Sequence, residues 1–349
     1  MSLLDQQSLT PRLVRNRLSL FNSYRRGEAT LEGFPIELNV EVTGICNVDC
    51  IMCPQETMER SKGMMSMEVF KNIINQAKDY VEVVLLHIAG DPLLHPKLFE
   101  MIAYCRENKV KTLVSTNCVA LDERRSRAML KDPPDILILS FDGTSKEVYE
   151  KIRRRAHFEP TRENIKRFLQ MKRSKRILPY TMLQLIYMKE NQHQVNDFLK
   201  EWRVSSANEI RIKPYFDYPA VREYHGVGQR RPEPATKPCL YLWRQMAITW
   251  DGTVTACCLD MTGQLKMGDV NHQSLREVWN AEEFVNARKL HVQGRYKELA
   301  PCATCTMPQV GTPLLAGTVL LDSLSIKKIL PKIEKMALLW KIKRLNYMG

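Results

Sequence analysis

Residues 36–53 read IELNVEVTGICNVDCIMC, and this stretch decides how the rest of the chain is interpreted. Its first half alternates apolar and polar side chains, the pattern of a strand with one buried face. The apolar positions are Ile36, Leu38, Val40 and Val42. A helical pattern begins beyond the following loop, with Ser66 as its capping residue, and runs to about Asp79. Residues 36–79 therefore predict one strand-loop-helix unit.

The same alternation continues through five more strands. The predicted later strands are 81–87, 111–116, 136–141, 181–188 and 209–213, and the predicted helices between them are 96–108, 122–130, 145–172 and 192–202. Six such units predict an α/β fold with a parallel sheet, either open or closed into a partial barrel, and periodicity does not choose between these. In both architectures chemistry belongs beyond the carboxyl ends of the strands, where the polar and Cys-rich loops of this chain begin.

Three cysteines lie in the loop directly after the first strand, at the spacing C-x3-C-x2-C. They are Cys46, Cys50 and Cys53, and no fourth cysteine is nearby in the sequence. An iron-sulfur cubane with three thiolate ligands keeps one iron open for substrate or cofactor chemistry. A zinc site is the alternative, although zinc ligands usually come as paired C-x2-C.

This loop resembles the radical S-adenosylmethionine (SAM) superfamily, whose members carry CxxxCxxC after the first strand of a partial (β/α)6 TIM-like barrel. The resemblance implies that Cys46, Cys50 and Cys53 hold a [4Fe-4S] cluster whose open iron binds the amino and carboxylate groups of SAM. Electron transfer then cleaves SAM to a 5′-deoxyadenosyl radical, with a flavodoxin- or ferredoxin-type electron donor as partner.

Other features of the superfamily follow in the expected order. The segment Ala89-Gly90-Asp91-Pro92 resembles Gly-Gly-Glu-Pro, which receives the SAM amino group, although a plain strand-to-helix loop is the alternative. The resemblance implies ribose contacts at the ends of the third and fourth strands, and a carboxylate contact from an arginine that is otherwise a surface residue. The residues implied to contact SAM are Met52, Ala89, Gly90, Asp91, Ser115, Asn117, Ser140 and Arg153. Met52, Ala89 and Asp91 depart from the usual residues, as does Cys118 after Asn117.

A second group of cysteines follows a Pro- and Gly-containing linker. Asp251-Gly252 between two short apolar runs predicts a hairpin. The stretch from Cys239 onward resembles the SPASM/Twitch module, which implies one auxiliary [4Fe-4S] cluster. Its ligands by that resemblance are Cys239, Cys257, Cys302 and Cys305, with Cys258 as the spare thiol. Four thiolates also suit zinc, which remains the alternative. Cys105 and Cys118 are interpreted as packing residues.

These assignments predict five parts of the chain. They are an N-terminal extension (1–33), a radical SAM core (34–214), a linker (215–238), a SPASM/Twitch domain (239–310) and a basic amphipathic tail (311–349). The tail sequence SIKKILPKIEKMALLWKIKRL can lie on an anionic membrane surface as a peripheral contact, or pack back on the barrel.

The resemblance supports two substrate classes. The first is a sugar or cyclitol alcohol that is oxidised, because one auxiliary cluster and modest length resemble the 2-deoxy-scyllo-inosamine dehydrogenase group. The second is a ribosomal peptide modified by thioether formation, epimerisation or cyclisation. A non-catalytic iron-sulfur or zinc scaffold is the remaining alternative. Asp260 is a candidate base by position only, and a solvated hairpin residue is the other interpretation.

Composition excludes several classes of protein. The chain has 349 residues, of which 44% are hydrophobic and 26% charged, and these values argue against disorder. No run approaches the roughly 18 to 20 apolar residues of a membrane-spanning helix, and the N-terminus does not resemble a signal peptide. We therefore expect a cytoplasmic protein with its ten cysteines reduced. The net charge of +13 indicates an acidic partner or solvated basic helices, and nucleic acid is not expected as that partner.

Overall fold

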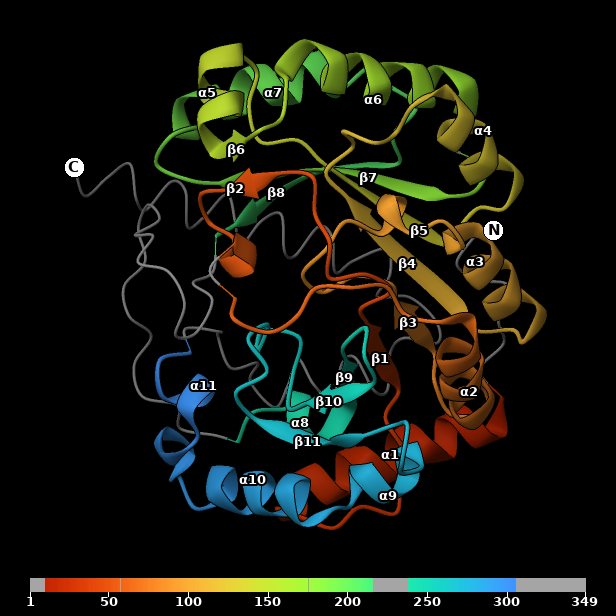
Figure 1. The fold of residues 1–349 in the computed structure, drawn as a ribbon, viewed down its shortest axis with the longest axis vertical. Helices are drawn as coiled ribbons and strands as arrows, with labels where there is room; N and C mark the ends of the chain where they lie inside the picture. The colour runs from red at the N-terminus through yellow and green to blue at the C-terminus, as the bar shows by residue number, and fades with distance from the viewer. Residues whose placement is uncertain (1–9, 57, 175, 216–237, 306–349) are drawn as a thin grey trace.

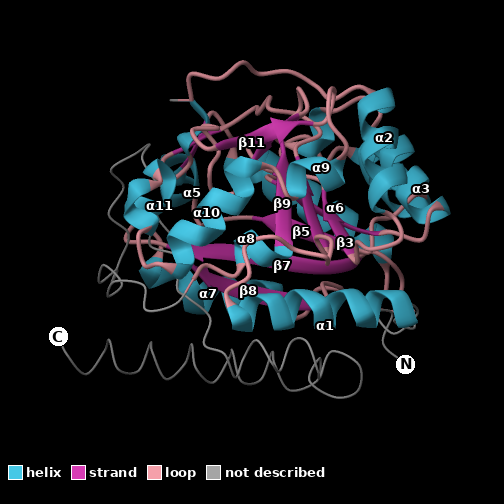
Figure 2. Cartoon of the chain, turned by 90° about the horizontal axis from the view of Figure 1, so that it is seen from below, coloured by secondary structure: helices cyan, strands magenta, loops and turns pink. Residues whose placement is uncertain are grey.

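The structure is a computed structural model, and it describes residues 10–56, 58–174, 176–215 and 238–305. Its centre is a nine-stranded sheet with the order β11-β10-β9-β1-β3-β4-β5-β7-β8. Figure 1 shows this sheet curving around the interior of the molecule, with helices on its outer side. Figure 2 shows the same sheet from below, with its strands enclosed by helices.

Six parallel strands form the first part of this sheet, as the sequence predicts. They are β1 (Glu37–Val40), β3 (Val83–Leu85), β4 (Lys111–Thr116), β5 (Ile136–Ser140), β7 (Tyr180–Tyr187) and β8 (Glu209–Pro214). The helices between them are α2 (Met67–Ala77), α3 (Leu98–Glu107), α4 (Glu123–Lys131), α5 (Lys146–Ile152), α6 (Phe158–Lys172) and α7 (Val195–Trp202). Strand residues facing these helices are fully buried, among them Leu137, Leu139, Leu183 and Leu185.

The prediction of a single helix over residues 145–172 is wrong. The stretch 145–172 divides into α5 and α6, because Arg153 and Arg154 leave the helix to form strand β6 (Arg153–Arg154). That strand pairs antiparallel with β2 (Asp49–Cys50) in the cysteine loop. Arg155 then adopts a positive φ of 66°, which no helix continues through. Helical periodicity alone does not detect this break.

The C-terminal module continues the same sheet. Its strands are β9 (Gln245–Ile248), β10 (Thr253–Thr255) and β11 (Lys266–Asp269), and its helices are α8 (Tyr241–Arg244), α9 (Leu275–Trp279), α10 (Glu282–Val292) and α11 (Ala300–Ala303). The predicted hairpin is confirmed, since β9 and β10 pair antiparallel and Gly252 has a φ of 94°. Strand β9 also pairs parallel with β1, so the module and the barrel share one sheet.

The N-terminal segment packs on this module. Helix α1 (Pro11–Arg26) is capped by Thr10 and ends at Gly27, and Figure 1 shows it in red beside the blue helices α9 and α10. The Tyr24 ring meets the Trp243 ring edge-on at 5.5 Å, and the Trp243 Nε1 donates to the Glu28 carbonyl at 2.8 Å. The described part of the predicted extension, residues 10–33, thus packs on the C-terminal module, and Arg17 also pairs with Glu82 beside β3.

The predicted tail (311–349) and nearly all of the predicted linker (215–238) lie outside the described residues. Among the helices that are described, none combines the length and the apolar character that crossing a membrane requires.

Candidate active site

The three-cysteine loop leaves the carboxyl end of β1 and is held by backbone contacts on several sides. The Asp91 N–H donates to the Ile45 carbonyl at 2.9 Å, and the Gly44 N–H donates to the Gly63 carbonyl at 2.9 Å. A Cβ on Gly90 would lie 2.2 Å from the Thr43 carbonyl oxygen. Only glycine allows so close a backbone approach, which is the physical reason for Gly90 in the Ala89–Pro92 segment.

Arg153 reaches the second cysteine of this loop. The pairing of β2 with β6 places it directly opposite Cys50, and its Nη1 lies 3.6 Å from the Cys50 Sγ. Its Nε and Nη2 bind the Asp142 carboxylate at 2.8 and 2.6 Å, and both side chains are buried. Asp142 also accepts the Ile186 N–H at 2.7 Å. A fixed cation therefore lies beside the Cys50 sulfur. The alternative prediction, that Arg153 is a surface residue, is wrong.

Asn117 and Asp91 support the loop from the ends of β4 and β3. The Asn117 Nδ2 lies 3.7 Å from the Cys46 Sγ and donates to the Asn47 Oδ1 at 2.8 Å. The buried Asp91 carboxylate accepts from the Asn117 N–H at 2.7 Å and the Leu93 N–H at 2.9 Å, and it also accepts from the Thr116 hydroxyl. Both polar side chains are thus engaged with the protein as well as facing the cysteine loop.

The three thiols are gathered and largely removed from water. Burial raises the pKa of Cys46 to about 11 and that of Cys53 to about 12, and it raises the pKa of Cys50 as well. Cys50 and Cys46 add to the rise at Cys53, so the thiols lie within electrostatic reach of one another. Such thiols become thiolates when iron takes the place of the proton.

This arrangement fits a [4Fe-4S] cluster with three protein ligands, because three thiols converge and N–H donors approach two of the sulfurs. Within the described residues, no group of three His, Cys, Asp or Glu side chains is arranged to hold a single metal ion. Cys105 and Cys118 are fully buried in the hydrophobic core, as expected for packing residues.

The second set of thiols gathers in the C-terminal module. Cys239 and Cys302 each have their pKa raised, first by burial and then by Cys257, and Cys305 adds to the rise at both. Cys258 lies beside this set: its side chain is the largest influence that raises the pKa of Cys257, followed by burial, and its Sγ lies 3.9 Å from the Gln245 Nε2. The thiols of this module are numerous enough to fit a second cluster, and the choice between Cys257 and Cys258 as a ligand stays a prediction.

Asp260 is not a solvated hairpin residue, because its side chain is buried. Its carboxylate accepts the backbone N–H groups of Gln264 at 3.0 Å and Leu265 at 2.9 Å. These bonds close the turn between Cys257 and β11, so Asp260 shapes the loop of the second set.

A buried ion pair joins the two cysteine sites, and sequence reasoning missed it. Glu41 directly follows β1 and is fully buried, and its carboxylate binds Arg60 Nη1 and Nη2 at 2.9 and 2.5 Å. It also accepts the backbone N–H groups of Ala89 and Trp250, both at 3.2 Å. Arg60 donates in turn to the Met261 carbonyl at 2.5 Å. The sequence signal that could have indicated this ion pair is the charged residue Glu41 directly after an apolar strand.

The other residues that are predicted to contact SAM lie in several different elements. Met52 is a buried residue of the three-cysteine loop itself, and Ala89 is buried beside Met58 and Met261. Ser115 and Ser140 lie near the carboxyl ends of β4 and β5, on the side of the sheet away from the helices. The structure thus brings these residues to the same edge of the sheet as the three-cysteine loop.

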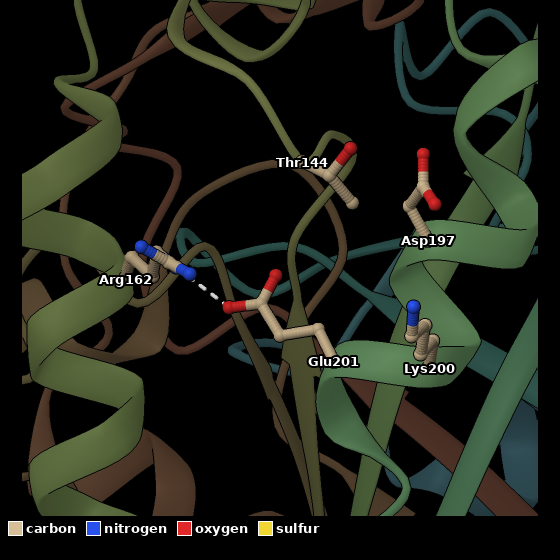
Figure 3. A pocket seen from close by; sticks show the side chains of 5 residues that line it. All are labelled: Thr144, Arg162, Asp197, Lys200 and Glu201. Carbon is tan, nitrogen blue, oxygen red and sulfur yellow. Dashed lines mark hydrogen bonds and ion pairs between the residues drawn. The ribbon is translucent and has the colours of Figure 1, made fainter.

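A solvent-open hollow of about 510 Å³ lies elsewhere, between α6 and α7. Figure 3 shows its lining residues, Thr144, Arg162, Asp197, Lys200 and Glu201. Arg162 and Glu201 are paired with each other at 2.6 Å. The hollow belongs to the outer helix layer and contains no cysteine, so it is separate from the candidate site.

Two family models match the chain. The model of the radical SAM superfamily matches residues 40–201, and that of an iron-sulfur cluster-binding domain (SPASM) matches residues 239–306. The first match begins at the last residue of β1 and includes the three-cysteine loop. The second begins at Cys239 and ends just after Cys305.

Relatives and solved structures agree with these matches. A tungsten-containing aldehyde ferredoxin oxidoreductase cofactor-modifying protein of Pyrococcus furiosus is 21% identical over 316 residues, covering 76% of this chain and 86% of its own. The PqqA peptide cyclase of Gluconobacter oxydans is 24% identical, covering 79% of this chain and 84% of its own. The structure of BtrN with AdoMet and 2-DOIA has a TM-score of 0.54 at 17% identity, covering 79% of this chain and 95% of its own. These neighbours confirm the TIM-like fold.

Proposed function

This chain belongs to the radical SAM superfamily and carries a C-terminal iron-sulfur cluster-binding domain, and on that premise we propose that Cys46, Cys50 and Cys53 hold its SAM-cleaving [4Fe-4S] cluster. The observation that carries the proposal is that the three thiols after β1, one buried and two half-buried, lie within electrostatic reach of one another and have N–H donors beside two of their sulfurs. When bound, the clusters supply the electron that cleaves SAM and an acceptor for an electron lost by the substrate.

The residues of the chain hold and shield this site. Gly90 and Asp91 fix the loop against β3 and β4, and the Arg153–Asp142 pair places a cation at the Cys50 sulfur. Ser115 and Ser140 are proposed to meet SAM, because neither hydroxyl makes a hydrogen bond within the described part of the chain. The Arg153 guanidinium is proposed to assist the SAM carboxylate while it remains paired with Asp142.

We propose that the second set, Cys239, Cys257, Cys302 and Cys305, holds one auxiliary [4Fe-4S] cluster. Cys257, unlike Cys258, is among the groups that raise the pKa of Cys239 and of Cys302, which supports Cys257 as the ligand and its neighbour Cys258 as the spare thiol. A single auxiliary cluster suits the loss of one further electron, which an alcohol must give up after hydrogen-atom abstraction if it is to become a ketone.

Oxidation of a sugar or cyclitol alcohol is therefore the proposed reaction. A hydrogen atom moves from the carbinol carbon to the 5′-deoxyadenosyl radical, a proton leaves the hydroxyl oxygen, and one electron leaves for the acceptor. The single set of four auxiliary thiols supports this candidate, as does the near-complete coverage of the BtrN chain.

Modification of a peptide is the second candidate. It is supported by the likeness to the PqqA peptide cyclase along most of both chains. Substrates deuterated at the reacting carbon separate the candidates, because deuterium then appears in 5′-deoxyadenosine together with either a ketone or a modified peptide. A ketone from a cyclitol panel supports the first candidate, and its absence beside a modified peptide supports the second.

Release of 5′-deoxyadenosine tests the proposal itself. The full chain is reconstituted anaerobically with iron and sulfide and mixed with SAM and dithionite. Native protein is expected to release 5′-deoxyadenosine slowly without substrate. Replacing Cys46, Cys50 and Cys53 by Ala is expected to abolish release and to lower bound iron by about half, since the second set keeps its own cluster.

Cys105→Ala is the control, because Cys105 is a buried thiol that lies in α3, outside both cysteine sets. It is expected to keep both the iron and the release of 5′-deoxyadenosine. Native protein that binds zinc at the first set and refuses iron there would contradict the proposal.

A further inference from the structure

Strands β5, β7 and β8 carry a polar row on the face turned away from the helices. The register pairs Ser140 with Gln184, Gln184 with Arg211, and Ile186 with Lys213. Side chains two residues apart on a strand share a face, so Arg211 and Lys213 belong to this row. The opposite face carries leucines buried beneath the helices, which places the row on the barrel interior.

The two cations in this row differ in their partners. Arg211 Nε donates to the Glu209 carboxylate at 3.0 Å. Lys213 makes no side-chain hydrogen bond or ion pair with any described residue. Lys213 is an exposed residue near the carboxyl end of β8, yet the protein around its ammonium and the nearby Arg211 lower its pKa. An ammonium without a protein partner at the end of this strand would gain from a negative charge placed beside it.

A second unsatisfied group lies close to Lys213. His87 follows β3, and its buried Nδ1 has no hydrogen-bond partner among the described atoms. Burial, and next the charge of Lys213, lower the pKa of His87 to about 4, so the imidazole is neutral at neutral pH. The His87 Nδ1 and the Lys213 ammonium thus both lack a hydrogen-bond partner among the described atoms, and they lie within electrostatic reach of each other.

This place lies between the two cysteine sets. Lys213 is within electrostatic reach of Cys258, the neighbour of Cys257. It is also within reach of Asp142, whose partner Arg153 contacts Cys50. A substrate group held by Lys213 would therefore lie beside the path from the SAM-cleaving site to the auxiliary site.

We propose that Lys213, assisted by Arg211, binds a carboxylate or phosphate group of the substrate at the carboxyl end of β8. This inference rests on the proposed function and makes its substrate an acidic molecule, such as a sugar acid or a sugar phosphate. The acidic group fixes the position of the substrate. The distance of each substrate carbon from that group therefore determines which carbon reacts. A neutral analogue of the same shape leaves the Lys213 ammonium unpaired and binds weakly.

Lysine footprinting tests the inference without knowledge of the substrate. Reconstituted holoenzyme saturated with SAM is labelled with acetic anhydride, and acetylation at Lys213 is measured by mass spectrometry. The probes are malonate, inorganic phosphate and malonamide, the uncharged counterpart of malonate. At an anion concentration about ten times its dissociation constant, labelling of Lys213 is expected to fall about tenfold. Lys200 in the outer hollow is the control, with unchanged labelling.

The two anions distinguish the chemical source. Protection by malonate alone assigns a carboxylate, and protection by phosphate alone assigns a phosphate. Arg211→Gln keeps the reactive Lys213 and is expected to weaken protection. Lys213→Gln is expected to leave SAM binding unchanged.

Three results would overturn the inference: no acetylation of Lys213 in the anion-free enzyme, equal protection by malonamide, or loss of SAM binding in Lys213→Gln. Release of 5′-deoxyadenosine is measured in the same sample and tests the proposed function separately, because its absence would contradict that function. An enzyme that releases 5′-deoxyadenosine but shows no anion protection refutes only the role of Lys213.

Discussion

The two cysteine sites are built in opposite ways. Cys46 to Cys53 span eight consecutive residues, and backbone contacts from neighbouring strands fix their loop. Cys239 to Cys305 span 67 residues, and helices and aromatic packing bring their four thiols together. A contiguous site depends on close local sterics, whereas a dispersed site depends on the stability of a whole module. The two sites should therefore fail for different reasons.

Gly90→Ala tests whether the first cysteine site depends on close packing of its own loop, and it has the largest expected effect. The new Cβ meets the Thr43 carbonyl oxygen at 2.2 Å and the Ile45 carbonyl oxygen at 2.6 Å, so the cysteine loop must move. We expect loss of the first cluster and of 5′-deoxyadenosine release, with the second cluster retained. Iron analysis and electron paramagnetic resonance of the reconstituted variant measure both.

Gly294→Ala is the control for this substitution. A Cβ added at Gly294 would meet no atom within 4 Å, although the φ of 74° there makes alanine cost about 1 kcal/mol. Both clusters are expected to persist in this variant. Normal iron content and activity in Gly90→Ala would show that close packing at Gly90 does not hold the loop.

Trp243→Ala tests whether the second cysteine site depends on the stability of the whole C-terminal module. Its expected effect is the second largest. Trp243 is fully buried between α1 and the module, and removing it should cost about 3 to 5 kcal/mol of unfolding free energy. Denaturant unfolding measures that loss. Because Trp243 follows Cys239 by four residues, we expect the second cluster to be lost before the first.

Trp243→Phe is the graded control for the second site. It keeps most of the buried volume and loses the Nε1 bond to the Glu28 carbonyl, which costs about 1 kcal/mol. The auxiliary cluster should then persist. Equal loss of both clusters in Trp243→Ala would mean that the shared β1–β9 pairing makes the two sites one cooperative unit.

The same contrast explains what the sequence could predict. The alternating residues of β1 and the adjacent cysteines are local signals, and the six parallel strands follow from repeated local patterns. The contact of Arg153 with Cys50 and the ion pair of Glu41 with Arg60 join residues far apart in sequence, and no periodicity encodes them. The pairing of β9 with β1 was missed for the same reason. The role of Asp260 was misjudged because burial depends on that tertiary packing.

Asn117→Ala has the smallest expected effect and sharpens the description of the first site. The Asn117 Nδ2 approaches the Cys46 Sγ, and hydrogen bonds to cluster sulfurs raise the reduction potential by stabilising the more negative reduced state. Its removal should therefore lower the potential of the first cluster and leave that of the second unchanged. A redox titration followed by electron paramagnetic resonance measures both potentials in one sample.

The affinity for SAM separates this role from a ribose contact. If Asn117 acts on the cluster, the potential shifts while the dissociation constant of SAM stays near the native value. An unchanged potential with weakened SAM binding would assign Asn117 to the ribose instead. Since Asn117 also donates to Asn47 at 2.8 Å, Asn47→Ala is the matched control: it removes that acceptor and leaves the Asn117 donor near Cys46. A shift in Asn117→Ala that exceeds the shift in Asn47→Ala therefore belongs to the N–H group at the sulfur rather than to loosening of the loop.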